Sequence, residues 1–392
     1  MNATERFLNY VKFETASDEE SVSCPSTAGQ TVLAEYLAGE LKGIGVADAA
    51  YDENGYVYGH IEASRGYDNA PKIGLIAHMD TSPAVSGKDV KPQIIVFDGK
   101  NAPMVEGKYI GEELIVSDKT TLLGADDKAG VAEIIAACER IIADDTMKHG
   151  RISICFTPDE EIGRGADRFD FERFGADFAY TVDGDYEGEV AYENFNAASA
   201  SFEIKGVNVH PGEAKDIMIN AALAGCEIAS LLPENETPAH TEGREGFYHL
   251  TDFSGDIAHA KVNYIVRDHD KATFEKRLDT LRGIEKKMNE KYHADTVKLN
   301  IQHSYSNMLE VIEKNEYVVA IAKKAIKNVG LEPVSRPVRG GTDGARLSFM
   351  GLPCPNLGTG GYGFHGPFEH ISVEGMDTAV SVIKEIVKIT AE

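Results

Sequence analysis

The chain has no tryptophan and only five cysteines among its 392 residues, and none of the cysteines forms a C-x-x-C pair. Cys138 falls in an apolar helical pattern and Cys155 in a strand-like one, where buried reduced thiols are common. An odd number of scattered cysteines argues against a disulfide framework and is typical of a reducing compartment. We therefore expect a cytoplasmic protein in which no cysteine acts as a nucleophile.

Basic residues are also scarce, since 39 Lys and Arg stand against 64 Asp and Glu and the formal net charge is −25. Such a chain offers no basic stripe to the phosphates of a nucleic acid. No run approaches the roughly 20 apolar residues that span a bilayer, and the N-terminus has no basic segment followed by an apolar one. We therefore expect no nucleic-acid partner, no membrane span and no signal peptide.

The length favours two domains, because 392 residues are too many for one ordinary core. The first half alternates helical and strand-like patterns, which predicts a doubly wound α/β core with a helix at 27–43, strands at 56–61 and 73–77, a helix to about 142, and strands at 151–156 and 178–182. From about residue 198 the order becomes β-α-β-β-α-β, the ferredoxin-like arrangement, with elements at 199–205, 217–232, 247–253, 257–267, 271–292 and 296–303. Helical patterns at 318–329 and 372–390 then return to the core. The predicted domains are a discontinuous core of residues 1–197 and 309–392 and an inserted lid of residues 198–308.

Four apolar runs of the core end in residues of the types that bind metals. These residues are His78 with Asp80, Glu160 with Glu161, Asp183, and His365. A lone run of carboxylates such as Asp159-Glu-Glu is usually a solvated acidic turn, because water screens the mutual repulsion. In open α/β sheets, however, ligands bind beyond the carboxyl ends of the strands. Several strands that bring His, Asp and Glu to one edge therefore predict a metal site there.

His78 and Asp80 are two residues apart, so on an extended chain their side chains point to the same side. A carboxylate beside a metal-binding imidazole commonly fixes its tautomer, and we interpret Asp80 as the residue that orients His78. Asp126 and Asp127 begin the helical pattern that runs to about 142, where the helix dipole alone favours acidic residues. Asp126 becomes a ligand candidate only because the other candidates accompany it.

Six motifs follow one another along the chain: His78-Met-Asp-Thr-Ser-Pro, Leu123-Gly-Ala-Asp-Asp-Lys-Ala-Gly, Thr157-Pro-Asp-Glu-Glu, Tyr180-Thr-Val-Asp-Gly, Asn208-Val-His-Pro-Gly and Arg339-Gly-Gly-Thr-Asp-Gly. In type and order they resemble the M20 family of di-zinc aminopeptidases and carboxypeptidases, and within it the peptidase T branch of tripeptide aminopeptidases. The likeness runs nearly end to end. It implies a zinc-peptidase core that carries an inserted lid.

The resemblance implies that His78 and Asp183 bind one metal ion, that Glu161 and His365 bind the other, and that Asp126 bridges the two. Imidazole and carboxylate ligands without thiolate suit two Zn²⁺ ions, with Co²⁺ or Mn²⁺ as substitutes. Two such cations, about 3.5–4 Å apart, polarise a carbonyl group and acidify a water. The resemblance also implies a cis peptide bond after Asp126.

Glu160 precedes the ligand Glu161, and we expect it to act as the general base that carries a proton from water to the leaving amine. The expected substrate-binding residues are His210, Asn220, Arg267 and Arg339. The resemblance implies that His210 donates to the oxyanion, with Asn220 nearby, and that Arg267 grips the peptide carboxylate. Arg339 is a second candidate for that carboxylate, because a guanidinium fork matches its geometry.

Two features depart from the family pattern. The segment after Phe364 offers both His365 and His370, and we choose His365 because Glu369 follows it by four residues, as in the family's H-x-x-x-E pattern. The sequence Tyr186-Glu-Gly after Asp183 is more acidic than the resemblance implies, which would alter the electrostatics of the site or the choice of substrate.

The leading hypothesis is a cytoplasmic di-zinc exopeptidase that releases the N-terminal residue from short peptides, mainly tripeptides. A related amidase, such as a dipeptidase, a carboxypeptidase or a deacylase, would use the same metal site. A non-catalytic peptide-binding protein would be favoured if Glu160 or a ligand were missing, and none is. A glycosidase needs paired acids but leaves the histidines without a role. An exposed edge strand of the insert could pair two chains, so a homodimer is a further hypothesis.

Overall fold

A computed structural model describes residues 1–102, 105 and 109–392, and its contacts divide the chain into two compact units. Unit 1 comprises Met1–Tyr192, Met308–Arg336 and Thr342–Glu392, and unit 2 comprises Glu193–Asn307 with Pro337–Gly341. Unit 2 thus begins at Glu193, earlier than the predicted boundary, and includes a short later segment. The reason is backbone pairing: the Val338 N–H donates to the Glu193 carbonyl at 2.8 Å.

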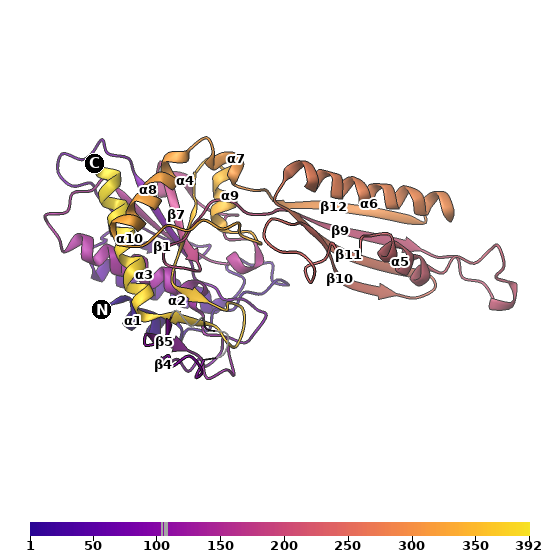
Figure 1. The fold of residues 1–392 in the computed structure, drawn as a ribbon, viewed down its shortest axis with the longest axis horizontal. Coiled ribbons are helices and arrows are strands. Elements are labelled where there is room, and N and C mark those ends of the chain that lie inside the picture. Colours follow the sequence, from indigo (N-terminus) through magenta and orange to yellow (C-terminus); the bar gives the residue numbers. More distant parts are fainter. Residues whose placement is uncertain (103–104, 106–108) are drawn as a thin grey trace. The chain divides into compact units, whose positions relative to one another are not determined.

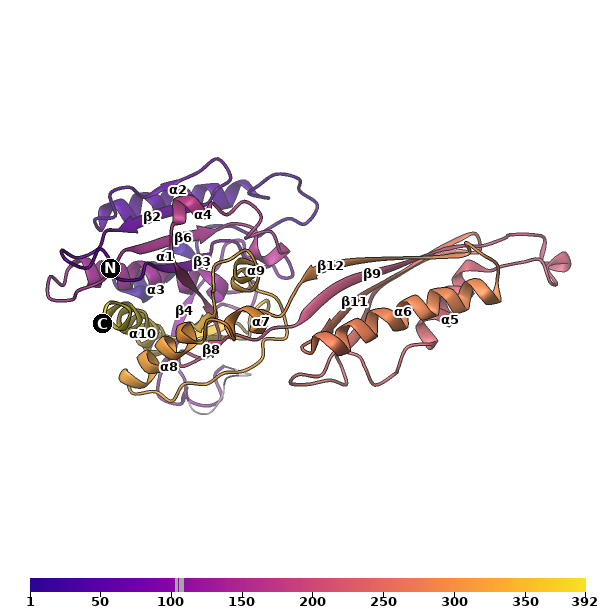
Figure 2. The same ribbon diagram turned by 90° about the horizontal axis from the view of Figure 1, so that it is seen from above.

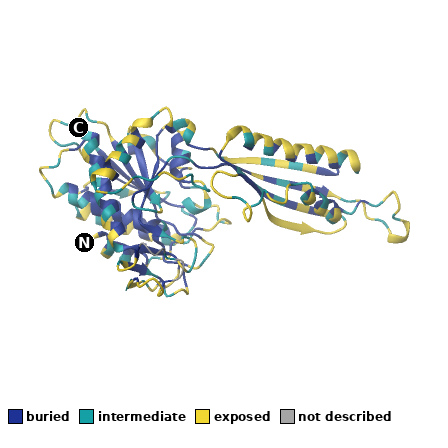
Figure 3. Ribbon diagram, in the orientation of Figure 1, coloured by how far each residue is buried: buried dark blue, intermediate teal, exposed yellow. Residues whose placement is uncertain are grey.

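The main sheet of unit 1 has seven strands in the order β1-β2-β6-β3-β7-β13-β8. Its strands β1 and β7 are labelled in Figure 1. Their bounds in that order are Ala50–Tyr51, Val57–Ile61, Ile152–Thr157, Ile73–His78, Phe178–Gly184, Asn356–Gly358 and Val190–Ala191. The four strands β6, β3, β7 and β13 run parallel to one another, whereas β2 and β8 pair antiparallel with their neighbours. All residues of β3 and β6 are buried, as expected for parallel strands with both faces covered. The interior of unit 1 is accordingly dark blue in Figure 3.

Helices cover both faces of this sheet. Its helices are α1 (Ala3–Tyr10), α2 (Ala28–Gly43), α3 (Ala125–Ile142), α4 (Phe171–Phe174), α7 (Leu309–Ile312), α8 (Glu316–Asn328), α9 (Asp343–Phe349) and α10 (Val373–Ala391). On one face α3 packs on β3 and β7 and is flanked by α1 and α10. A second buried cluster includes Tyr58, Ile76, Phe174 and Leu347 and lies under α4 and α9. The predicted doubly wound core is confirmed.

The first helix, α1, begins at a reciprocal capping pair of side chains and backbone amides. Asn2 is its N-cap, and the Asn2 side chain accepts from the Glu5 N–H at 2.8 Å while the Glu5 carboxylate accepts from the Asn2 N–H at 3.0 Å. This reciprocal pair satisfies two amide groups that the helix itself leaves without partners.

A second sheet of unit 1 was missed by the sequence patterns. Its strands are β14 (Gly361–Tyr362), β15 (His370–Ser372), β5 (Glu113–Val116) and β4 (Gln93–Val96), in that order. The strands are short, and β4 is largely exposed, so no run of alternating apolar residues marks them. Because β14 pairs antiparallel with β15, the loop between them, which contains His365, is held at both ends.

Unit 2 has the predicted β-α-β-β-α-β order: β9 (Asn196–Lys205), α5 (Ala221–Ser230), β10 (Phe247–Gly255), β11 (His259–Asp268), α6 (Lys271–Lys291) and β12 (Val297–Tyr305). The strand order β10-β11-β9-β12, antiparallel throughout, is that of a ferredoxin-like sheet. Helices α5 and α6 pack on one face of this sheet (Figure 2). In the described part of the chain no helix is both long and apolar enough to cross a membrane.

Candidate metal centre

The carboxyl ends of three neighbouring parallel strands supply most of the predicted ligands. His78 is the last residue of β3, and it pairs with Thr157, the last residue of β6. Glu160 and Glu161 follow in the short 3-10 turn Glu160–Ile162, and Asp183 lies near the end of β7. Adjacent parallel strands end at the same edge of a sheet, so these side chains meet there.

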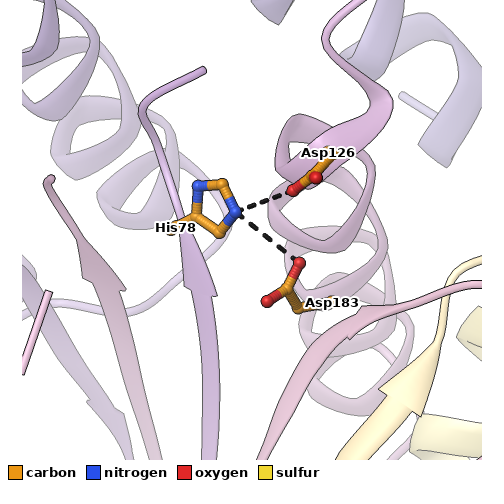
Figure 4. Close-up of side chains that lie close together, drawn as sticks. All are labelled: His78, Asp126 and Asp183. Carbon is orange, nitrogen blue, oxygen red and sulfur yellow. Dashed lines mark hydrogen bonds and ion pairs between the residues drawn. The ribbon is translucent and has the colours of Figure 1, made fainter. Parts of the chain in front are cut away.

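One group of candidate ligands consists of His78, Asp126 and Asp183. The His78 Nε2 atom lies 2.8 Å from Asp126 Oδ1 and 3.6 Å from Asp183 Oδ1 (Figure 4). The His78 side chain is buried, and α3 brings Asp126 to it from the helix's first turn. The peptide bond between Asp126 and Asp127 is cis, as the resemblance implies.

The other group consists of Asp126, Glu161 and His365. The His365 Nε2 atom lies 3.0 Å from Asp126 Oδ2 and 2.9 Å from Glu161 Oε2. The two oxygens of Asp126 therefore face different histidines, one on each side of the carboxylate. Glu161 Oε1 is buried and has no hydrogen-bond partner among the described residues.

These distances fit two metal ions that share Asp126. Zinc binds histidine nitrogen and carboxylate oxygen at about 2.0–2.2 Å, so two ligand atoms of one ion lie less than about 4.4 Å apart. All four distances above meet this limit, and the set of imidazoles and carboxylates suits Zn²⁺. The orphaned Glu161 Oε1 is explained if that group binds a cation.

The neighbouring carboxylates at this edge of the sheet repel one another. Burial, with the charge of Asp126, raises the pKa of the Asp183 carboxyl to about 6, and burial raises the pKa of Glu161 to about 7. Hydrogen bonds to Asp126 and Glu161 raise the pKa of His365 to about 10. The protein keeps three carboxylates together only with positive charge among them. A pair of divalent cations supplies that charge more fully than two imidazoliums.

His370, the alternative to His365, lies elsewhere. Its ring is buried in β15, stacks on Tyr362 at 5.7 Å between centroids, and places Nδ1 2.9 Å from the Phe368 carbonyl oxygen. His370 belongs to neither of the two ligand groups.

Asp80 does more than the sequence indicates. Its Oδ1 lies 3.3 Å from His78 Nδ1, and its backbone carbonyl oxygen lies 3.1 Å from the same nitrogen, so the orienting role of the carboxylate stays a prediction. The same carboxylate accepts the backbone N–H groups of Glu160, at 3.0 Å to Oδ1, and of Glu161, at 3.1 Å to Oδ2. Asp80 is fully buried and so connects His78 to the acidic turn of Glu160 and Glu161.

Glu160 lies beside the ligands without belonging to either group. Its Oε2 is 4.0 Å from His78 Nε2, and its side chain is 15% exposed. Burial raises the pKa of the Glu160 carboxyl well above its ordinary range, and the neighbouring charges of Asp183 and Asp343 add to the increase. A carboxylate with raised proton affinity, 4.0 Å from a nitrogen of the first ligand group, is suited to accept a proton.

Asp127 and Asp159 also hold the site together, a role that their local sequence does not indicate. The Asp127 carboxylate accepts the backbone N–H of His78 at 3.1 Å, which ties β3 to the start of α3. Asp159 accepts the Ser26 N–H at 2.8 Å and the Gln30 side-chain amide at 2.7 Å. Both aspartates are fully buried. No local pattern distinguishes an acid that binds distant amides from one in a solvated turn.

Glu369 anchors the loop that carries Asp126. Its Oε2 accepts the backbone N–H groups of Leu123 at 2.7 Å and Gly124 at 2.9 Å, and its Oε1 accepts that of Asp126 at 3.0 Å. The side chain is 1% exposed. The segment from His365 to Glu369 thus contacts Asp126 at two places: His365 at the Asp126 carboxylate, and Glu369 at the Asp126 backbone N–H. Only the four-residue spacing from His365 indicated that Glu369 matters.

Replacing Glu369 by glutamine should weaken metal binding at the His365 group. The amide can keep one acceptor oxygen, but its NH₂ faces at least one backbone N–H, so residues 123–126 shift. Loss of such an outer partner typically costs about 10- to 100-fold in metal affinity. Zinc competition with a chromophoric chelator and the visible absorption of the Co²⁺-substituted protein would measure the change.

The matched control is Glu374→Gln, because Glu374 is exposed and makes one long hydrogen bond, 3.5 Å from its Oε1 to the Glu113 backbone nitrogen. An unchanged zinc affinity and cobalt spectrum in Glu369→Gln, with only a lower melting temperature, would show that Glu369 supports the fold and not the centre.

The predicted substrate-binding residues all lie in unit 2. His210 is exposed, and its Nδ1 accepts the Gly212 N–H at 3.2 Å. Asn220 is the N-cap of α5, where its side-chain oxygen accepts the Leu223 N–H at 3.1 Å. Asn220 therefore has a clear structural role of its own.

Arg267 and Arg339 differ in how they are bound. Arg267 donates to the carbonyl oxygens of Ala198 at 3.2 Å and Val266 at 3.0 Å. Arg339 donates to four acceptors of the loop Thr241–Glu245 at 2.9–3.3 Å and lies over the rings of two phenylalanines. Neither guanidinium has a carboxylate partner within the described residues.

Comparison with known proteins identifies the family. The sequence model for "Peptidase family M20/M25/M40" matches residues 123–389. The chain belongs to this family. It is therefore a peptidase, a hydrolase of peptide bonds, as the six motifs implied.

Its relatives are similar over nearly their whole length. The chain is 51% identical to a protein named Peptidase T from Caldanaerobacter subterraneus subsp. tengcongensis, over 98% of both chains. It is 50% identical to Peptidase T of Bacillus subtilis (strain 168), over 98% of this chain and 97% of the relative. The crystal structure of aminopeptidase PepT from Bacillus cereus ATCC 10987 has the same fold, with a TM-score of 0.80 at 22% sequence identity. The match covers 100% of this chain and 98% of the PepT chain.

Proposed function

We propose that the protein is a di-zinc aminopeptidase that releases the N-terminal residue of tripeptides. The observation that carries the proposal is the arrangement of two ligand groups that share Asp126, with Glu160 unligated beside them. The relatives named Peptidase T, about half identical over nearly the whole chain, support the choice of substrate. The five free cysteines support a cytoplasmic location.

Two bound Zn²⁺ ions would polarise the scissile carbonyl and lower the pKa of the attacking water. His78 and Asp183 would hold one ion, Glu161 and His365 the other, and Asp126 both. Because Asp80 and Glu369 fix the backbone of these residues, the ligands are held ready before substrate arrives.

Glu160 moves the proton in the proposed reaction. Its carboxylate takes a proton from the water as the water oxygen bonds to the scissile carbonyl carbon. As the C–N bond breaks, Glu160 delivers that proton to the leaving amine nitrogen. The products are the free N-terminal amino acid and the shortened peptide, and Glu160 returns to its starting state.

The residues of unit 2 would bind the rest of the substrate. We assign His210 as donor to the carbonyl oxygen, accompanied by Asn220, because His210 is exposed. We assign the peptide carboxylate to Arg267, whose guanidinium has only two carbonyl acceptors, in preference to Arg339, which is engaged by four. The edge strands β10 and β12 would offer a surface for a homodimer.

Length selection tests this proposal. An exopeptidase can measure a peptide only if it grips both ends, so a tripeptide should be cleaved faster than the matching dipeptide or tetrapeptide. Amidating the C-terminus of a good tripeptide, or making Arg267→Ala, should lower kcat/KM by about 10- to 100-fold, because each removes a charge-assisted hydrogen bond. The two changes together should cost little more than either alone.

Arg339→Ala is the matched control, since its guanidinium already bonds the loop Thr241–Glu245. It should slow the amide and the free acid by the same factor. Fully additive losses for Arg267→Ala and amidation would show that Arg267 does not bind the carboxylate. Hydrolysis that is equal for peptides of two, three and four residues would refute the tripeptidase proposal.

A further inference from the structure

A cavity of about 520 Å³ in unit 1 opens beside the second ligand group. Glu161 and His365 line one side of it, and the consecutive acids Asp18, Glu19 and Glu20 line another. The function proposed above uses the two ligands but gives no task to the three acids.

The ligand side of the cavity is built to meet a positive group. The Glu161 side chain is 5% exposed, and its buried Oε1 has no hydrogen-bond partner among the described residues. His365 Nε2 lies 2.9 Å from the other oxygen of Glu161. The cavity therefore adjoins the place where a cation would bind, which is also where the scissile carbonyl must lie.

The acidic side is held by its backbone, not by its side chains. Arg164 donates to the carbonyl oxygens of Glu19 at 2.9 Å and Ser21 at 2.7 Å. The Arg164 N–H donates to the Asp159 carbonyl at 2.9 Å, which ties this acidic loop to the turn of Glu160 and Glu161. The backbone of the acidic loop is thus fixed with respect to the ligands.

The acidic side chains remain available to a ligand. Asp18, Glu19 and Glu20 are exposed, and in the described part of the chain none of them forms an ion pair with a basic residue. Asp18 Oδ1 accepts the Glu20 N–H at 3.0 Å and so shapes the loop. The carboxylates of Glu19 and Glu20 have no such task, so they add negative charge to the cavity without supporting the loop.

We propose that this cavity receives the N-terminal residue of the peptide and that its carboxylates select for positive charge there. The inference rests on the proposed aminopeptidase function. Of the two ends of a tripeptide, the carboxylate end is repelled by three acids and the ammonium end is attracted. A lysine or arginine side chain on the first residue adds a second positive charge. Peptides that begin with Lys or Arg are therefore the favoured substrates.

Paired substrates isolate the side-chain charge. Lys-Gly-Gly and norleucyl-Gly-Gly have first residues of nearly equal length that differ in the terminal ammonium. The zinc-loaded enzyme should show a kcat/KM ratio of about two to five in favour of lysine, as expected for solvent-exposed charge pairs. Glu19→Gln/Glu20→Gln should bring the ratio close to one. Raising the ionic strength to about 1 M, where the screening length is about 3 Å, should do the same.

The matched control is Glu62→Gln/Asp68→Asn. It also removes two negative charges, but near the amino ends of β6 and β3, away from the carboxyl ends that carry the candidate ligands. Glu62 follows β2 beside the start of β6, and Asp68 precedes β3, and both are exposed. This variant should keep the lysine preference. A kcat/KM ratio near one in the unsubstituted enzyme would overturn the inference, and so would a lysine preference that persists in Glu19→Gln/Glu20→Gln. In either case, cleavage of both peptides would still support the aminopeptidase function. Cleavage of neither peptide would overturn both.

Discussion

Glu160→Gln should retain both metal ions and lose about 10²- to 10⁴-fold in kcat, because glutamine cannot accept the proton of the attacking water. The backbone N–H of residue 160 still donates to Asp80, so the acidic turn keeps its shape. Since the loss falls on the chemical step, kcat and kcat/KM should fall together. Steady-state kinetics and metal analysis of the same preparation would measure both quantities.

Glu161→Gln is the internal comparison, because the two side chains are adjacent and the substitution is the same. Glu161 Oε2 lies 2.9 Å from His365 Nε2, whereas Glu160 belongs to neither ligand group. Glu161→Gln should therefore reduce the metal content by one ion. If Glu160→Gln emptied a metal site and Glu161→Gln left both filled, the two roles would be exchanged.

Removing the metal ions should abolish hydrolysis, and Zn²⁺ or Co²⁺ should restore it. Without cations, the carboxylates of Asp126, Asp183 and Glu161 face one another with only His78 and His365 to balance them. Metal binding should therefore also stabilise the fold, by about 2.7 kcal/mol when the free metal is at 100 times its dissociation constant. Activity assays and melting curves of chelated and reconstituted protein would test both effects.

Chelation followed by Mg²⁺ serves as the control, because Mg²⁺ prefers octahedral oxygen ligands and gains little from two imidazoles. Full hydrolysis by a rigorously metal-free preparation would contradict the metal mechanism. A chelated protein that melts at the same temperature as the reconstituted one would show that the ligand carboxylates do not repel one another as their positions suggest.

Much of the centre could be predicted because its ligands stand at the ends of recognisable strands. β3, β6 and β7 appear in the sequence as apolar runs, and the residues that follow them share one edge of a parallel sheet by geometry. The order of the motifs then predicted Glu161, and not its neighbour Glu160, as the ligand, and Glu161 is the one of the two that belongs to a candidate ligand group. The β-α-β-β-α-β order of the insert was equally visible, because its elements alternate between two clear periodicities.

Other features could not be read from local patterns. Strands β4, β5, β14 and β15 are short, so no periodic run marks them, and the sheet is completed only when β15 pairs with β5 across more than 250 residues. The boundary of unit 2 differs from the predicted one because the segment Pro337–Gly341 joins unit 2, through the backbone pairing of Val338 with Glu193 and through the hydrogen bonds of Arg339 to the loop Thr241–Glu245. Sequence periodicity reports which face of an element is buried, and it does not report which distant backbone amide a strand or loop will meet.

The sequence by itself determined the class of fold, the family and the chemical types of the ligands, because each depends on residue identity and local spacing. Tertiary structure alone decided how those ligands are held. Asp80, Asp127, Asp159 and Glu369 are buried carboxylates that bind backbone N–H groups of segments far away in the chain. A buried carboxylate must find such donors, since leaving it unpaired is costly, and which donors it finds depends on the folded chain. Glu19 and Glu20 are exposed acids whose position also depends on tertiary structure, because only the folded chain places them at the cavity beside Glu161.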